Sequence, residues 1–184
     1  MPGIDDSKPF LAVRIAVLTV SDSRSLDDDR SGAVLVERVK AAGHEVADRH
    51  IVTDDVAVIV ETLRSWIDDA GVDVVIATGG TGVTGRDVTP EAFDEVCDKA
   101  IPGFGELFRW LSFRKIGTST IQSRATAGVA GGTYLFALPG SPGACRDAWD
   151  DILVHQLDYR FGPCNFVELM PRLLETGRAT ARGS

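Results

Sequence analysis

The chain has 184 residues, 44% of them hydrophobic, and a formal net charge of −8 at pH 7. This length is enough to bury one substantial core but is short for two domains. The acidic balance excludes a nucleic-acid partner held by a broad basic surface, so an anionic ligand would have to be bound by local groups.

Two strands and two helices are expected in the first part of the chain. Residues 13–20 form a nearly continuous apolar run, rich in β-branched side chains and too short for a typical helix, which is typical of a strand buried on both faces. Residues 31–42 follow helical spacing, and Gly43 is expected to end that helix. A less apolar strand is expected at 45–52 and an amphipathic helix at 54–69.

Two further strands and the remaining helices are expected in the second part. Residues 72–78 predict a third buried strand. Thr89, which precedes a proline, indicates the N-cap of the next helix, and the Ile-Pro-Gly sequence at 101–103 separates that helix from another. Residues 133–138 predict a fourth buried strand, and Pro142 is expected to open a last long helix.

Strands that alternate with helices predict a three-layer α/β/α fold with a mainly parallel, doubly wound sheet. We expect a single domain at 13–170, a flexible N-terminal segment at 1–12 and a polar C-terminal tail at 171–184. Ligands of such folds bind beyond the carboxyl ends of the strands. The loops that follow the four predicted strands are therefore the expected site loops.

Neither secretion nor membrane insertion is indicated by the sequence. Residues 1–9 include acids where a signal peptide needs a basic start, and no apolar run approaches the ~18 residues that span a bilayer. Cys97, Cys145 and Cys164 lie far apart and include no C-x-x-C pair, which indicates neither a disulfide framework nor a zinc site. We expect a cytoplasmic protein with no membrane partner.

The loop at 78–91 is the strongest functional signal. Its four glycines let the backbone approach a bulky anion and turn N–H groups toward it, so phosphate is the expected ligand. Residues 80–85 also match G-x-G-x-x-G, but the expected helix starts later than a dinucleotide fingerprint requires. A P-loop needs a lysine and then a hydroxyl residue after its last glycine, whereas Arg86 and Asp87 stand there.

The acidic residues near these loops each allow two interpretations. Asp87 can bind Mg²⁺ beside a phosphate, because a hard cation prefers carboxylate and phosphate oxygens, or it can complement the dipole of the following helix. Asp54 and Asp55 follow the second strand, where one carboxylate can share a metal while the other caps a helix. The acidic run at 27–29 is expected to be a solvated loop.

Polar residues of three further segments complete the candidate set. Residues 138–142 repeat the order of strand, glycine turn and helix start, so their N–H groups and the Ser141 hydroxyl can face the same crevice; an N-cap role for Ser141 is the alternative. Residues 19–24 lie at the exit of the first strand. Residues 117–124 are expected to be a hydroxyl-rich loop that suits a phosphorylated substrate.

Five motifs together resemble a known family. They are Leu-Thr-Val-Ser-Asp-Ser-Arg at 18–24, Thr-Gly-Gly-Thr-Gly at 78–82, Arg-Asp-Val-Thr-Pro-Glu at 86–91, Ser-Arg-Ala-Thr-Ala-Gly at 123–128 and Leu-Pro-Gly-Ser-Pro at 138–142. In this order they resemble the MoaB/MogA family of molybdenum-cofactor biosynthesis over about residues 14–166. The segments 117–124 and 163–166 are more similar to the B proteins of that family than to the A proteins.

The resemblance implies a molybdopterin adenylyltransferase, in which the terminal phosphate of the pterin attacks the α-phosphorus of Mg-ATP and gives adenylyl-molybdopterin and pyrophosphate. It implies that Asp54 and Asp87 serve Mg²⁺ and the transferred group, and that Ser123 helps to place molybdopterin. The nucleotide-binding residues that it implies are Gly79, Gly80, Thr81, Gly82, Pro139, Gly140 and Ser141. The implied molybdopterin-binding residues are Thr19, Ser21, Asp22, Arg24, Ser31 and Arg124.

Two alternatives to this enzyme stay open. The first is a catalytically silent protein of the same fold that binds molybdopterin or acts as a scaffold for other enzymes of the pathway. The second, a nicotinamide-dependent dehydrogenase, depends on the G-x-G-x-x-G match alone. The resemblance also implies a homo-oligomer, a trimer or a hexamer, and Phe108, Trp110 and Phe113 lie on a predicted helix with apolar residues on more than one side.

Overall fold

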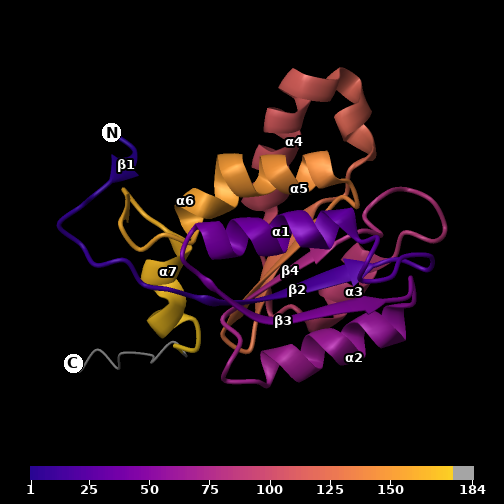
Figure 1. Ribbon diagram of the computed structural model, residues 1–184, viewed down its shortest axis with the longest axis horizontal. Helices are drawn as coiled ribbons and strands as arrows, with labels where there is room; N and C mark the ends of the chain where they lie inside the picture. Colours follow the sequence, from indigo (N-terminus) through magenta and orange to yellow (C-terminus); the bar gives the residue numbers. More distant parts are fainter. Residues whose placement is uncertain (176–184) are drawn as a thin grey trace, which may run out of the picture.

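The computed structural model describes residues 1–175, so residues 176–184 of the predicted polar tail lie outside the described residues. At its centre is a six-stranded sheet with helices on both faces (Figure 1). The strand order is β3 (Glu45–Val52), β2 (Arg14–Val20), β4 (Val74–Thr78), β7 (Thr133–Leu138), β6 (Thr126–Ala130) and β5 (Lys99–Ala100). The first four strands in this order are parallel, and β6 and β5 are added antiparallel at one edge. The expected α/β/α fold with a mainly parallel sheet is confirmed.

The helices form a layer on each face of the sheet. One layer consists of α1 (Arg30–Ala41), α4 (Pro102–Ile116) and α5 (Pro142–Ala148), and the other of α2 (Val56–Ile67) and α3 (Thr89–Val96). The π-helical turn η2 (Trp149–Leu153) and α6 (Val154–Gln156) continue α5 directly, which gives the predicted long helix from Pro142. The shorter elements are the 3-10 helices η1 (Gly117–Gln122) and η3 (Met170–Arg172), α7 (Phe166–Leu169), β1 (Gly3–Ile4) and β8 (Phe161–Gly162).

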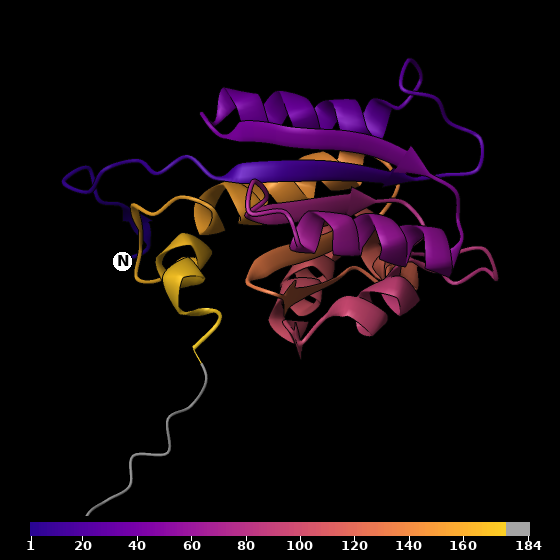
Figure 2. The ribbon, with the colours of Figure 1, turned by 90° about the horizontal axis from the view of Figure 1, so that it is seen from below.

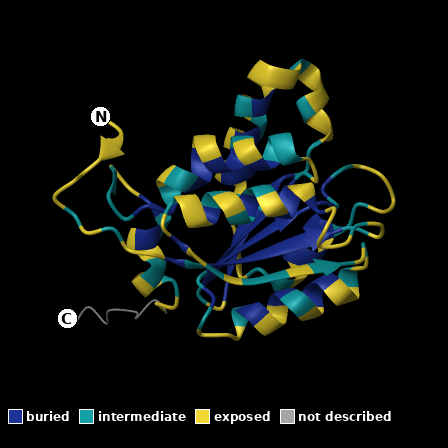
Figure 3. Cartoon of the chain, viewed as in Figure 1, coloured by how far each residue is buried: buried dark blue, intermediate teal, exposed yellow. Residues whose placement is uncertain are grey.

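Side-chain alternation along the central strands divides the core between the two faces. Val17 and Ile76 pack with α1, α4 and α5, whereas their chain neighbours Leu18 and Ala77 pack with α2 and α3. All four side chains are fully buried, and Figure 3 shows the central strands as the most buried part of the molecule. Because successive side chains point to opposite faces, a strand covered on both sides must be apolar at nearly every position, as the predicted runs are.

Residues 1–12, expected to be flexible, contact the segment 160–162. Strand β1 pairs antiparallel with β8, and the Arg160 guanidinium lies 5.2 Å from the centre of the Phe10 ring. Figures 1 and 2 both place this N-terminal arm beside the C-terminal segment. A two-residue pairing within a polar segment leaves no periodic signal, so the sequence did not indicate it.

Two of the expected helix caps are present and one is wrong. The Asp55 side chain caps α2 by accepting a hydrogen bond from the Val58 N–H at 3.1 Å. The Ser141 side chain caps α5 by accepting from the Ala144 N–H at 3.2 Å. Thr89 does not cap α3, because Val88 occupies that position and the Thr89 hydroxyl donates to the Gly79 carbonyl at 2.8 Å instead. That bond holds the glycine loop against the start of the helix.

The order of the strands opens a crevice at their carboxyl ends. Strand β2 leads to α1 on one face, whereas its neighbour β4 leads to α3 on the other. The two loops therefore diverge, which is the usual position of a ligand site in open α/β sheets. Within residues 1–175, no helix is long and apolar enough to cross a membrane.

Candidate active site

A cavity of about 590 Å³ lies at the carboxyl ends of β2, β4 and β7. It brings together most of the site residues that the sequence predicts. Those in its lining are Thr19, Ser21, Arg24, Ser31, Gly79, Gly80, Thr81, Gly82, Asp87, Ser123, Pro139, Gly140 and Ser141. Asp22, Asp54 and Arg124 do not line it. Asp22 instead lines a second hollow of about 510 Å³, which shares Ser21 and Arg24 with the first.

The glycine loop requires glycine at its first two positions. Gly79 and Gly80 have φ angles of 104° and 62°, in the left-handed region that favours glycine. A Cβ at Gly79 would lie 2.2 Å from the Val20 carbonyl oxygen, and a Cβ at Gly140 would lie 3.1 Å from the Gly79 Cα. The loops after β2, β4 and β7 are therefore in close contact. Gly85, by contrast, has open space around it and no positive φ.

Backbone N–H groups of this loop are available to an anion. Within the described part of the chain, no hydrogen bond uses the N–H of Gly80 or Thr81, although the Gly80 carbonyl accepts from the Thr89 N–H at 3.0 Å. Free N–H groups in a glycine-rich turn at the end of a strand form an anion-binding concavity. The predicted phosphate-binding character of the loop thus has a specific location, at Gly80 and Thr81.

The Asp87 carboxylate is held in the same loop. It accepts hydrogen bonds from the Thr84 backbone N–H at 2.8 Å and from the Thr84 hydroxyl at 2.7 Å. Partial burial acts to raise the pKa of Asp87, but these bonds outweigh it and the pKa is lowered. A Cβ at Gly82 would lie 2.7 Å from Asp87 Oδ2, so the carboxylate lies directly against the glycine backbone.

The Asp54 carboxylate also lies against the glycine loop, beside Gly80. A Cβ at Gly80 would lie 3.2 Å from Asp54 Oδ1, and the Asp54 N–H donates to Asp22 Oδ1 at 3.1 Å. Partial burial and the neighbouring Asp22 charge raise the pKa of Asp54. Asp22 also forms an ion pair with Arg86, which links the loop after β2 to the glycine loop.

The residues at this loop fit Mg²⁺ bound together with phosphate. Within the described residues, no three His, Cys, Asp or Glu side chains form a metal-binding group. Magnesium commonly takes only one or two carboxylates from a protein and fills its octahedron with water and substrate phosphates. Asp87 beside Gly82 and Asp54 beside Gly80 match that donor set.

Asp29, expected in a solvated loop, is one of the most buried acids of the molecule. It has 2% of its surface exposed and caps α1 by accepting from the Gly32 N–H at 2.9 Å. Its carboxylate also accepts from the Thr19 hydroxyl at 2.7 Å and from Arg49 Nη2 at 2.9 Å. The prediction of a solvated loop holds for Asp27 and Asp28, which are exposed, and is wrong for Asp29, because Thr19 of β2 and the sequence-distant Arg49 of β3 enclose its carboxylate.

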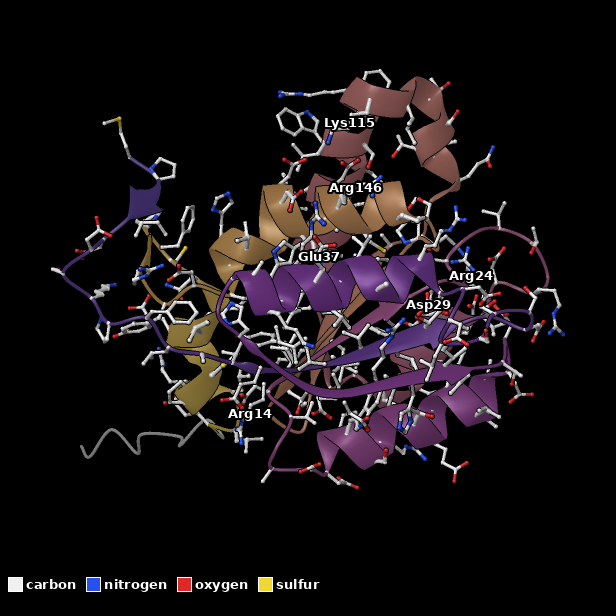
Figure 4. All side chains as sticks on the ribbon, viewed as in Figure 1. Arg14, Arg24, Asp29, Glu37, Lys115 and Arg146 are labelled. Carbon is white, nitrogen blue, oxygen red and sulfur yellow. The ribbon has the colours of Figure 1, made fainter. Side chains whose placement is uncertain are left out.

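Arg24 and Ser31 connect this buried acid to the cavity. Arg24 Nη1 lies 4.0 Å from Asp29 Oδ1 and 3.4 Å from the Ser31 hydroxyl oxygen. The Ser31 hydroxyl donates to the Gly140 carbonyl at 3.1 Å, which joins the start of α1 to the loop after β7. Figure 4 shows Arg24 and Asp29 together at the N-terminal end of α1. A basic side chain is thereby fixed at the cavity wall.

A further part of the cavity lining comes from α4 and η1, and part of it was not predicted. Segment 117–122, expected to be a loop, is a 3-10 helix. The lining residues from these two elements include Phe108, Ser112, Lys115, Ile116, Ser119, Thr120 and Gln122. The last three lie in the segment that was expected to suit a phosphorylated substrate, whereas Phe108, Ser112 and Ile116 were not assigned to the site. Lys115 donates to Asp147 at 2.6 Å and lies on α4 above α5 in Figure 4. Hydroxyl groups at 118–123 were the only available signal, because the apolar pattern of α4 does not distinguish core from cavity.

Arg124, which the resemblance implies as a molybdopterin-binding residue, makes its side-chain contacts with the glycine loop and α3. Its guanidinium donates to the carbonyls of Gly82 and Asp87 and to the Glu91 carboxylate. It lies behind the glycine loop and does not line the cavity. A planar guanidinium with five donors can satisfy several acceptors at once, and here those acceptors belong to the protein.

Known proteins are similar to this chain over most of its length. Residues 16–159 match the family model of a probable molybdopterin binding domain. The chain is 51% identical over 160 residues to molybdenum cofactor biosynthesis protein B of Escherichia coli, which covers 87% of this chain and 94% of that protein.

Solved structures show the same similarity in three dimensions. A crystal structure of a molybdenum cofactor biosynthesis protein B matches with a TM-score of 0.79 at 42% identity, over 82% of this chain and 94% of that one. The tungsten cofactor synthesizing protein MoaB of Pyrococcus furiosus matches with a TM-score of 0.70 at 36% identity, over 77% and 91% of the two chains. With its fold, its glycine loop and these relatives taken together, the chain belongs to the MoaB/MogA family of molybdenum cofactor biosynthesis proteins.

Proposed function

We propose that the protein adenylylates molybdopterin with Mg-ATP and releases pyrophosphate. One observation carries the proposal. A single cavity is lined by the glycine loop with Asp87 and also by Arg24, Lys115 and the hydroxyl groups near Ser123. Two phosphorylated substrates can therefore bind next to each other in it, each with its own set of donors.

The nucleotide would occupy the side formed by the loops after β4 and β7. The free N–H groups of Gly80 and Thr81 suit the polyphosphate, and the contact between Gly79 and Gly140 brings the second loop, Pro139 to Ser141, to the same place. Mg²⁺, when bound, would neutralise charge on the phosphates, and Asp87 with Asp54 would hold it. The lowered pKa of Asp87 keeps that carboxylate ionised at neutral pH.

Molybdopterin would occupy the side of Arg24, Ser31 and Ser123. Its terminal phosphate is the nucleophile, and a phosphate monoester is largely dianionic at neutral pH because its second pKa is about 6. The protein then has to position the two phosphates and neutralise their charge rather than supply a strong base. The cavity lining within residues 1–175 contains no histidine or cysteine, which is compatible with this chemistry.

The direct test is a coupled assay with ATP, Mg²⁺ and molybdopterin. We expect pyrophosphate and adenylyl-molybdopterin to form in equal amounts. If folded protein binds molybdopterin but releases no pyrophosphate, the proposed enzyme activity is overturned. The alternative of a catalytically silent binding protein or scaffold is then supported. A dehydrogenase would instead have to bind a nicotinamide dinucleotide, and only the sequence pattern at 80–85 supports such binding.

We also propose a cytoplasmic homo-oligomer, a trimer or a hexamer. Trp110 and Phe113 of α4 are each 56% exposed and Ile121 of η1 is 81% exposed, and Figure 1 shows α4 projecting beyond the layer of α5. Large apolar side chains on a projecting element suit a contact between subunits. Light scattering should give about three or six times the 19.7 kDa chain mass, and Trp110→Glu should lower it. A monomeric wild type would contradict this assembly.

A further inference from the structure

Arg124 contacts the protein at both ends of the glycine loop. Its Nε donates to the Gly82 carbonyl at 2.6 Å and its Nη2 donates to the Asp87 carbonyl at 2.6 Å. Its Nη1 donates to Glu91 Oε1 on α3 at 2.5 Å, and its backbone N–H donates to the Thr81 carbonyl at 2.8 Å. Four bonds from one residue thus fix the loop relative to the helix that follows it.

These bonds, together with the Arg86–Asp22 ion pair, hold the segment from Gly82 to Asp87. Between Gly82 and Asp87 the chain is at the surface, and Val83 in it is 65% exposed. The bonds from Thr84 to the Asp87 carboxylate are local to the loop and would move with it. The distance between the Asp87 carboxylate and the free N–H groups of Gly80 and Thr81 therefore depends on the bonds from outside the loop, chiefly those of Arg124.

We infer that Arg124 is a positioning residue of the nucleotide and metal side, which holds Asp87 against the glycine backbone, and not a ligand of molybdopterin. The inference rests on the proposed function, since it specifies how the same site is kept in shape. It also separates Arg124 from its neighbour Ser123, whose side chain does line the cavity.

The same segment joins the two substrate sides. Arg109 of α4 donates to the Ser123 and Ala125 carbonyls at 3.4 Å and 3.0 Å, from the side opposite the glycine loop. Residues 123–125 are therefore held between α4, which forms the molybdopterin wall, and the loop that carries Asp87. Arg109 provides a comparison, because it holds the same segment without touching the glycine loop.

Lysine cannot replace Arg124 in this role. The guanidinium fork directs three N–H donors at fixed angles to Gly82, Asp87 and Glu91, whereas an ammonium is a point charge on a flexible stem. Arg124→Lys keeps the charge near Glu91 and loses the geometry, and Arg124→Gln loses both. Arg38→Gln is the matched control, because it also removes an arginine of α1 that pairs with a carboxylate, Asp150 of η2.

The experiment measures loop protection and the two affinities separately. We expect amide hydrogen exchange at residues 80–87 to accelerate about tenfold or more in Arg124→Lys and Arg124→Gln, and Mg-ATP affinity to fall about tenfold, with molybdopterin affinity within about twofold of wild type. Arg38→Gln should change none of the three. Glu91→Gln, which keeps Arg124, should shift exchange and Mg-ATP affinity in the same direction by less.

Three results would overturn the inference. One is a loss of molybdopterin affinity with Mg-ATP affinity unchanged, which would make Arg124 a direct ligand. The second is unchanged hydrogen exchange at residues 80–87 in folded variants, and the third is full rescue by lysine. A wild type that binds both substrates but releases no pyrophosphate would remove the proposed reaction and leave the positioning role supported by the exchange and affinity data.

Discussion

Asp87 and Asp54 lie beside the same glycine backbone, yet their carboxylates differ in electrostatic environment. Hydrogen bonds from Thr84 lower the pKa of Asp87, whereas burial and the Asp22 charge raise the pKa of Asp54. Asp87 is the better permanent cation ligand of the two. Asp54 gains most from a bound cation, because a positive charge beside it would offset its unfavourable surroundings.

Asp87→Asn should separate charge from shape at this position. The asparagine oxygen can still accept from Thr84, so we expect the free energy of unfolding to stay within about 0.5 kcal/mol of wild type. Pyrophosphate release should fall about a hundredfold or more, because metal-based charge stabilisation is worth several kcal/mol in such transfers. Initial rates at saturating substrate and urea unfolding measure the two effects. Wild-type rates from the variant would contradict the metal role.

Asp29 is the residue whose loss should most affect stability near the site. Its fully buried carboxylate accepts from Thr19, Gly32 and Arg49. Asp29→Ala leaves the Arg49 charge without its partner and removes the cap of α1, so we expect a loss of about 3 kcal/mol or more in urea unfolding. Asp29→Asn, which keeps an acceptor for Gly32, should lose less. Equal stability of Asp29→Ala and wild type would contradict the buried ion pair.

At the scale of elements, the sequence predicts what local pattern encodes. Strands β2, β4 and β7 were predictable because burial on both faces demands apolar runs, and β3 was expected as a less apolar strand. Strand β6 was not, because its Thr-Ala-Gly-Val-Ala sequence is mostly small residues and it is a strand only through pairing with β7. The two-residue turn of Gly131 and Gly132, both at positive φ, was an available hairpin signal.

The candidate site likewise contains parts that local sequence pattern predicts and parts that it does not. Backbone loops such as 79–82 and 139–141 follow directly from strands that the sequence predicts, and the structure brings them together. The roles of Asp29 and Arg124 depend on partners far along the chain, Arg49 in one case and Gly82 in the other. No local pattern reports such pairs, so the contacts of these two residues could not be predicted.

The start of α2 offers a test at the scale of one element. Asp55 caps the helix, while its neighbour Asp54 faces the glycine loop. We expect Asp55→Ala to lower the free energy of unfolding by about 1 kcal/mol with pyrophosphate release nearly unchanged. Asp54→Asn should lower pyrophosphate release and leave the free energy of unfolding nearly unchanged. Thermal melts and initial rates of the two variants, side by side, would show exchanged effects if the assignments were wrong.

At the scale of the whole molecule, His44 links stability to pH. It is 6% exposed, its Nδ1 accepts from the Val13 N–H at 3.3 Å, and Phe10 and Trp149 flank its ring. Burial lowers the pKa of His44 below its ordinary value of 6.5, with the Asp158 charge opposing. The folded state therefore favours the neutral ring, so the stability contribution is present above pH 6.5 and is lost as the pH falls below it.

The expected result is a urea midpoint that decreases from pH 7.5 to pH 5. His44→Gln, which removes the titrating ring, should be less stable than wild type at pH 7.5, and the difference should narrow at pH 5. The exposed His155 provides the control substitution, which should leave the pH dependence unchanged. A difference between wild type and His44→Gln that is constant over this range would contradict the assignment.

The pairing of β1 with β8 has a practical consequence for immobilising or labelling the protein. That pairing fixes the amino end of the chain at the end of the sheet opposite the cavity. A surface, a label or a second polypeptide joined there would be tethered at the back of the molecule, with the substrate entrance facing away. Immobilisation through the amino end should therefore leave the entrance open to solution.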